Sequence, residues 1–115
     1  MKRGDVYWAE LVPRSGSEQA GRRPVIVVSH DAFNGTLAWR SIIVVPVSTS
    51  SLQGKRGLTV VEIPAGAASL LRNCFAVCHQ ITTLDRAKLS KRIGALPPAI
   101  LREVETALRA AMDMD

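Results

Sequence analysis

The chain has 115 residues, of which 47% are hydrophobic and 22% are charged, which suits one folded core and excludes a disordered chain. Its 15 Lys and Arg residues outnumber its 10 Asp and Glu residues and give a formal net charge of +5. No apolar run approaches the ~20 residues of a membrane-spanning helix, and none near the start resembles a signal peptide, so we expect a single cytoplasmic domain, residues 1–115.

Short β-branched runs separated by turn residues make up most of the chain. Five segments have the composition of strands, namely residues 5–12, 24–29, 41–47, 58–63 and 73–82. Residues 31–37 contain Asn34-Gly35 and predict a turn or a short helical turn, whereas residues 13–21 and 48–57 are polar and predict loops. Strands that are apolar on both faces are typical of a small, strongly curved barrel, and a sandwich is the alternative.

The C-terminal segment changes to a helical period. Pro97-Pro98 can open a helix, because a missing N–H costs nothing in the first helical turn. Apolar residues then recur at helical spacing: Ile100, Leu101, Val104, Ala107, Leu108, Ala111 and Met112. We expect an amphipathic helix packed on the β domain, with its apolar stripe serving as core or as a dimer contact.

Metal and thiol chemistry have little support in the sequence. Cys74 and Cys78 lie in one expected strand, where four residues span roughly 13 Å. A disulfide needs Cα atoms about 4.4–6.8 Å apart, so we do not expect one here. The two histidines, His30 and His79, belong to no cluster with metal-ligand spacing. We expect both cysteines and both histidines to be structural, and we expect no metal and no cofactor.

Basic residues are concentrated in the first half of the chain. Residues 1–56 hold eight basic and four acidic residues, whereas residues 94–115 hold two basic and four acidic residues. A basic body with an acidic tail favours a polyanionic partner such as nucleic acid. The alternative is a charged surface that only keeps the protein in solution.

One junction between a loop and a strand stands out. The loop of residues 16–21 has glycines that allow a close approach, and it ends in Arg22 and Arg23 before Pro24. A residue before proline is biased towards extended backbone, so we expect Arg23 at a defined strand edge. Its guanidinium is a planar, permanently charged fork that suits a phosphate. The alternative is a pair of solvated arginines.

The sequence resembles the MazF/PemK family of bacterial toxin endoribonucleases. Four blocks carry the resemblance in the family's order: Arg3-Gly4-Asp5-Val6-Tyr7-Trp8; Gly16-Ser17-Glu18-Gln19 with Arg23-Pro24-Val25-Ile26-Val27-Val28-Ser29; Val44-Val45-Pro46-Val47-Ser48; and Gln80-Ile81-Thr82-Thr83-Leu84 with Leu89 and Ile93-Gly94. Any one block is a weak signal, but the four together span nearly the whole chain.

The resemblance implies a mainly β fold: a small SH3-like β-barrel of the MazF/PemK/CcdB type, with short helices and a C-terminal α-helix, usually as a homodimer. It implies metal-independent cleavage of single-stranded RNA, such as mRNA. In that reaction a 2′-hydroxyl attacks the adjacent phosphate and leaves a 2′,3′-cyclic phosphate and a 5′-hydroxyl. It also implies a cognate antitoxin whose acidic, disordered segment lies over the basic RNA groove.

The resemblance also assigns roles to single residues. The catalytic arginine of the family falls on Arg23, and its second functional hydroxyl falls on Ser48 or, less favourably, on Thr49. Serine in place of the usual threonine keeps the hydroxyl and loses the methyl that restricts χ1. Gln80 matches a glutamine along the RNA groove. The other expected RNA contacts are Ser17, Glu18, Gln19, Arg22, Thr49, Lys55 and Arg56.

Two other functions stay open. A toxin on the same barrel can inhibit DNA gyrase by protein–protein binding through its C-terminal helix, but that family lacks the arginine–hydroxyl pair. A passive RNA-binding barrel would want several aromatic side chains on one face. The five aromatic residues are dispersed along the sequence: Tyr7, Trp8, Phe33, Trp39 and Phe75. An endoribonuclease toxin is therefore the leading hypothesis.

Overall fold

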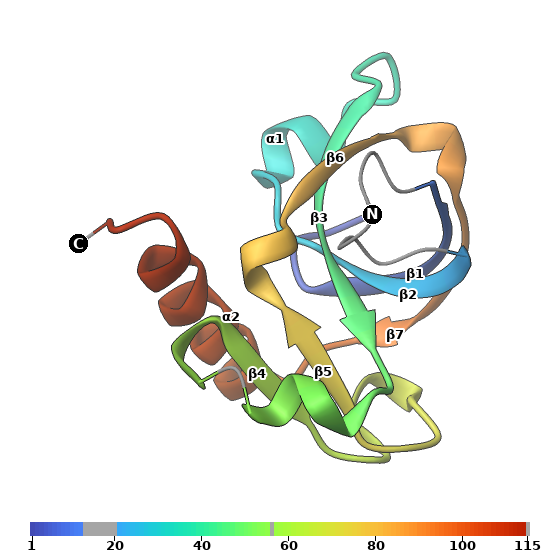
Figure 1. Cartoon of the computed structure of the whole chain (residues 1–115). Coiled ribbons are helices and arrows are strands. Elements are labelled where there is room, and N and C mark those ends of the chain that lie inside the picture. The colour runs from blue at the N-terminus through green and yellow to red at the C-terminus, as the bar shows by residue number, and fades with distance from the viewer. Residues whose placement is uncertain (13–20, 56, 115) are drawn as a thin grey trace.

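Antiparallel strands and a C-terminal helix build the computed structural model, which describes residues 1–12, 21–55 and 57–114 (Figure 1). Its strands are β1 (Asp5–Leu11), β2 (Gly21–Val27), β3 (Ser41–Ser48), β4 (Val60–Ile63), β5 (Cys74–Val77), β6 (Thr82–Asp85) and β7 (Leu89–Ala95). Its α-helices are α1 (Asp31–Asn34) and α2 (Pro98–Ala111). The expected mainly β domain, the short helical turn after the second strand and the helix opened by the proline pair are confirmed.

The strands form one strongly bent, seven-stranded sheet in the order β4-β5-β3-β2-β1-β7, with β6 paired to β3. Every pairing is antiparallel. Within the described part of the chain, β4 and β7 are the outer strands of this order and do not pair with each other. The sheet is therefore open at these edges.

The expectation of one strand over residues 73–82 is wrong. This segment consists of β5, the 3₁₀ helix η4 (Cys78–Gln80) and the start of β6. The two strands pair with the same edge of β3. Strand β5 pairs with Val47 and Ser48, and β6 pairs with residues 41–44. The interruption lies beside Pro46, which has no N–H to donate to a partner strand.

Two further boundaries differ from the expectation. The strand expected over residues 58–63 begins at Val60, because the 3₁₀ helix η2 (Gly57–Thr59) precedes it and Gly57 has a φ of +73°. Strand β7 was missed, because its exposed polar residues 90–92 hide the alternation that marks a strand. It pairs with β1 through two register shifts.

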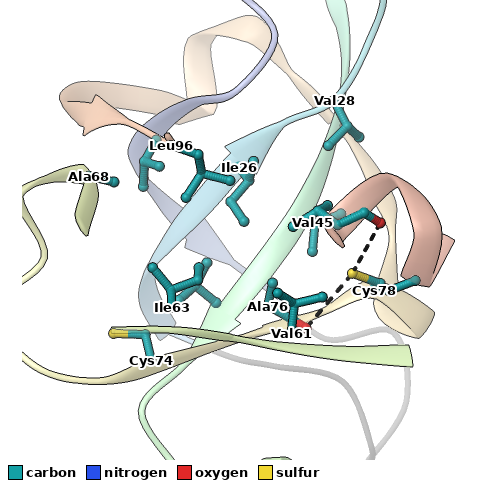
Figure 2. Close-up of a cluster of buried hydrophobic side chains, with 14 of the residues drawn as sticks. Ile26, Val28, Val45, Val61, Ile63, Ala68, Cys74, Ala76, Cys78 and Leu96 are labelled. Carbon is teal, nitrogen blue, oxygen red and sulfur yellow. Dashed lines mark hydrogen bonds between the residues drawn. The ribbon is translucent and has the colours of Figure 1, made fainter. Parts of the chain in front are cut away.

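Strands β1, β2 and β3 are buried on both faces, as the sequence predicted. One face belongs to a core shared with α2, which includes Ile26, Val45, Ile63, Ala76 and Leu96 (Figure 2). The opposite face belongs to a smaller cluster of Ala9, Leu11, Val25, Val27, Ile42, Val44 and Leu89. Alternate residues of each strand serve the two clusters, because successive side chains point to opposite faces.

The apolar stripe of α2 is part of the core of its own chain. Val104, Ala107 and Leu108 are buried, and Ile100 and Leu101 pack beside them. The helix is also tied to the sheet by polar contacts, since the Arg3 guanidinium pairs with Glu105 and its Nε donates to the Val28 carbonyl at 3.0 Å. Across the described ranges, no helix is both long and apolar enough to cross a membrane.

Candidate functional site

Arg23 lies near the start of β2, and Ser48 ends β3, the neighbouring strand. Val25 pairs with Pro46 at this end of the ladder, and only an extrapolation of that register by two residues would bring Arg23 opposite Ser48. The ladder stops at Val25 because Pro24 has no N–H to give to the next rung. Both residues point to the face of the smaller cluster, at its open end.

Ser48 ends β3 and is 3% exposed. Its Oγ accepts a hydrogen bond from the Ser50 backbone N–H at 3.1 Å, which fixes the turn that follows the strand. The hydroxyl therefore holds the turn with one lone pair and keeps its own proton for donation. Thr49 and Ser50, beyond the strand, are exposed.

Gln80 lies in the turn beside the middle of β3. It ends the 3₁₀ helix η4, which connects the strands paired with the two halves of β3, so this turn runs past Val45 and Pro46. His79 precedes Gln80 and shares a 2.8 Å hydrogen bond between its Nδ1 and the Thr59 hydroxyl. Gln80 therefore lies nearer to Val45 and Pro46 than to Ser48 along β3.

Lys55 is at the same end of the domain. It is exposed and closes the 3₁₀ helix η1 (Ser51–Lys55), which packs against β4 and β5. A Cβ added at Gly54 would come within 3.0 Å of the Phe75 ring, so glycine lets this helix lie directly on β5. Phe75 is the residue that pairs with Ser48.

Arg22 lies on the opposite face of β2 from Arg23. It is exposed, it pairs across the strands with Glu10, and its guanidinium carbon lies 4.6 Å from the centre of the Trp8 ring. This is a cation–π contact, and it holds the charge over an aromatic surface. Trp8 was not singled out in the sequence, because only the cross-strand register brings it near Arg22.

The remaining expected contacts, Ser17, Glu18, Gln19 and Arg56, lie outside the described residues. His30 is structural, as predicted: its Nδ1 accepts from the Ala32 backbone N–H and caps α1. The described candidate site thus offers a cation near the start of β2, a hydroxyl at the end of β3 and an exposed lysine in η1. Such donors can stabilise charge that develops on a phosphoryl group.

Metal and thiol groups do not converge on this strand end. Over residues 1–12, 21–55 and 57–114, no three His, Cys, Asp or Glu side chains come together to hold a metal ion. Both cysteines are free and buried, and Cys78 lies in η4 rather than in the strand expected for it. Burial raises the pKa of the Cys78 thiol to about 12 and also raises the pKa of the Cys74 thiol.

Comparison with known proteins finds full-length similarity. The family of PemK-like, MazF-like toxins of type II toxin–antitoxin systems matches residues 2–112. The chain is 34% identical to endoribonuclease MazF6 of Mycobacterium tuberculosis strain H37Rv over 114 residues, covering 99% of this chain and 98% of that relative. Solved structures include MazF from Deinococcus radiodurans (TM-score 0.80, 26% identity, 99% and 97% of the chains) and a MazE–MazF structure from the same organism (TM-score 0.74, 26% identity, 100% and 97%).

The burial of the two cysteines can be tested by chemical labelling. Because the thiolate is the nucleophile and burial keeps both thiols protonated, neither Cys74 nor Cys78 is expected to react with iodoacetamide at pH 8 while the protein is folded. Mass spectrometry should show two modified cysteines only after unfolding in denaturant. Rapid modification of the folded protein would contradict this assignment.

Proposed function

Because the chain belongs to the PemK-like, MazF-like family of toxins of type II toxin–antitoxin systems, we propose that it is an endoribonuclease. It cleaves single-stranded RNA, such as mRNA, without a metal ion. The observation that supports the proposal is that Arg23 and Ser48, the two residues matched to the family, lie just beyond the same end of the β2–β3 ladder. The full-length identity to a named endoribonuclease supports the same reaction.

The chain's own groups supply charge stabilisation in this reaction. The 2′-oxygen of the RNA attacks the adjacent phosphorus, the bond to the 5′-oxygen breaks, and a 2′,3′-cyclic phosphate forms. The 2′-hydroxyl loses a proton and the leaving 5′-oxygen gains one. Negative charge grows on the phosphoryl oxygens, where the Arg23 fork and the Ser48 hydroxyl donate hydrogen bonds.

The surroundings of this pair hold the RNA. Gln80 in η4, Thr49 after β3 and Lys55 in η1 would offer an amide, a hydroxyl and a cation to unpaired nucleotides. Arg22 contributes from the opposite face of β2, beside Trp8. By the family's pattern, Ser17, Glu18, Gln19 and Arg56 complete the groove.

The wider biology follows from the family. We propose that the bent sheet is the family's SH3-like barrel, that the protein is a cytoplasmic homodimer, and that a cognate antitoxin with an acidic segment neutralises it. The MazE–MazF structure supports such a partner. Inhibition of gyrase through the C-terminal helix has less support, because the apolar residues of α2 are already packed against the sheet of the same chain.

The reaction itself can be tested with purified protein and a single-stranded RNA containing all sequence contexts. Cleavage is expected to continue in excess EDTA, and the products should carry 2′,3′-cyclic phosphate and 5′-hydroxyl ends in mass spectrometry. An absolute requirement for a divalent ion, or 5′-phosphate products, would refute the mechanism.

Adjacent arginines on opposite faces of β2 form a matched pair. Arg23→Ala is expected to lower the single-turnover rate at saturating RNA about 100-fold or more, because one charge-stabilising donor is lost. Arg22→Ala should chiefly weaken binding and reduce its salt dependence. Circular dichroism checks that both variants fold. If both variants lost the same rate at saturating RNA, the assignment of catalysis to Arg23 and of binding to Arg22 would be wrong.

The Ser48 hydroxyl is tested by three substitutions. Ser48→Ala is expected to lower the cleavage rate about 100-fold, and it also removes the acceptor for the Ser50 N–H, at a stability cost of about 1 kcal/mol. Ser48→Thr keeps the hydroxyl and narrows its rotamers, so activity should be preserved or raised. Thr49→Ala is the control. If Ser48→Ala is nearly as active as wild type and Thr49→Ala is inactive, the hydroxyl belongs to Thr49.

A further inference from the structure

The structure gathers aromatic rings that the sequence leaves dispersed. Phe33 and Trp39 stack with their ring centres 4.5 Å apart and their planes 20° apart, and His30 packs edge-on against Phe33. Phe33 is 42% exposed and Trp39 is 44% exposed, although large aromatic side chains are usually mostly buried. We call the stacked side chains of Phe33 and Trp39 the aromatic platform.

One arginine, Arg86, holds the backbone of the segment that carries the aromatic platform. The Arg86 guanidinium donates to the backbone carbonyls of Phe33, Asn34, Thr36 and Trp39, at distances of 2.9 to 3.0 Å. The indole N–H of Trp39 donates to the Ser41 carbonyl at 2.7 Å. The Trp39 ring is therefore fixed by its own hydrogen bond, and Arg86 holds the backbone that carries both rings, which lowers the entropy cost of binding.

The charges around the platform favour an anionic ligand. Arg40 forms an ion pair with Asp85, and Arg3 forms one with Glu105, so these four charges offset one another. Lys2 and Lys88 remain as cations of these segments, and Asp31, which accepts a hydrogen bond from the Arg3 backbone N–H, is the further carboxylate. Backbone and side-chain hydrogen bonds from Arg3 and Asn34 lower the pKa of Asp31, so it is ionised at neutral pH and the balance stays positive.

The platform lies at the opposite end of β2 and β3 from the candidate site. Arg23 is near the start of β2 and Ser48 is at the end of β3, whereas α1 follows β2 and Trp39 precedes β3 (Figure 1). Six residues of extended chain separate Arg23 from Ser29, which is roughly 20 Å. A small β domain commonly binds about 4–16 nucleotides of single strand, so one RNA strand can reach both places.

We propose that the aromatic platform stacks an unpaired base of the RNA substrate, several nucleotides away from the cleaved bond. The inference rests on the proposed endoribonuclease function and adds a second contact region to it. Flat, exposed rings beside excess positive charge are the combination that binds single-stranded nucleic acid without strong sequence preference. The platform thus contributes to the affinity for long RNA and leaves the chemical step unchanged.

The test compares cleavage of two RNAs by wild type and by Trp39→Leu. One RNA is the shortest that the wild type cleaves, and the other extends it by ten nucleotides on each side. For the long RNA, Trp39→Leu should raise KM roughly 5- to 100-fold with kcat unchanged, the range expected for one lost base stack. The short RNA should be cleaved equally by both proteins. Trp39→Phe, which keeps an aromatic ring, should restore most of the affinity.

Leu37→Ala is the matched control, because Leu37 is 78% exposed in the same segment and lies outside the stack. Equal KM values of wild type and Trp39→Leu on the long RNA would overturn the proposal. So would a Trp39→Leu defect confined to dimerisation or antitoxin binding, since it would assign the platform to a protein partner.

A fluorescence experiment separates this inference from the proposed activity. In the Trp8→Phe, Arg23→Ala double variant, Trp39 is the remaining tryptophan and cleavage is suppressed. The long RNA should quench its emission, and the short RNA should not. Quenching would support stacking even if the wild type proved unable to cleave RNA, whereas RNA binding with no change in emission would overturn it.

Discussion

Strand β3 is hydrogen-bonded along both edges, and this constraint positions everything else in the molecule. One edge meets β2, and the other meets β6 and then β5. A strand held on both sides cannot slip by one residue without turning its buried side chains towards the wrong cluster. The candidate site at Ser48 and the aromatic platform before Ser41 therefore stay at a fixed separation, set by the length of this one strand.

Burial on both faces of the central strands also determines where the charged side chains lie. Since those strands cannot carry charged side chains in their middle, cations collect at strand ends, at edges and in turns. Arg86 serves as a structural cation that holds four carbonyls near α1. Arg3 joins Val28 to α2. The net charge of +5 therefore overstates the positive charge that is available to RNA.

Local patterns in the sequence predicted the features that depend on neighbours in the chain. The proline pair before α2, the β-branched runs of β2 and β3, and the extended position of Arg23 all follow from nearby residues. Strand β7 did not follow, because the exposed polar residues 90–92 of this edge strand hide the alternation that marks a strand. The Phe33–Trp39 stack and the Arg22–Trp8 contact were also missed, since tertiary geometry brings these rings together.

Two prolines, Pro24 and Pro46, interrupt backbone pairing beside the candidate site. Pro24 cannot donate to β3, so the β2–β3 pairing ends at Val25 and Pro46, whereas Pro46 lies at the break between β6 and β5 on the other edge of β3. Arg23 is instead paired with Ala9 of β1, and Ser48 is paired with Phe75 of β5. Each functional residue is therefore held by a different neighbouring strand. Under the proposed function, a phosphate drawing on both side chains would break no pairing between β2 and β3, because that ladder ends before Arg23 and Ser48.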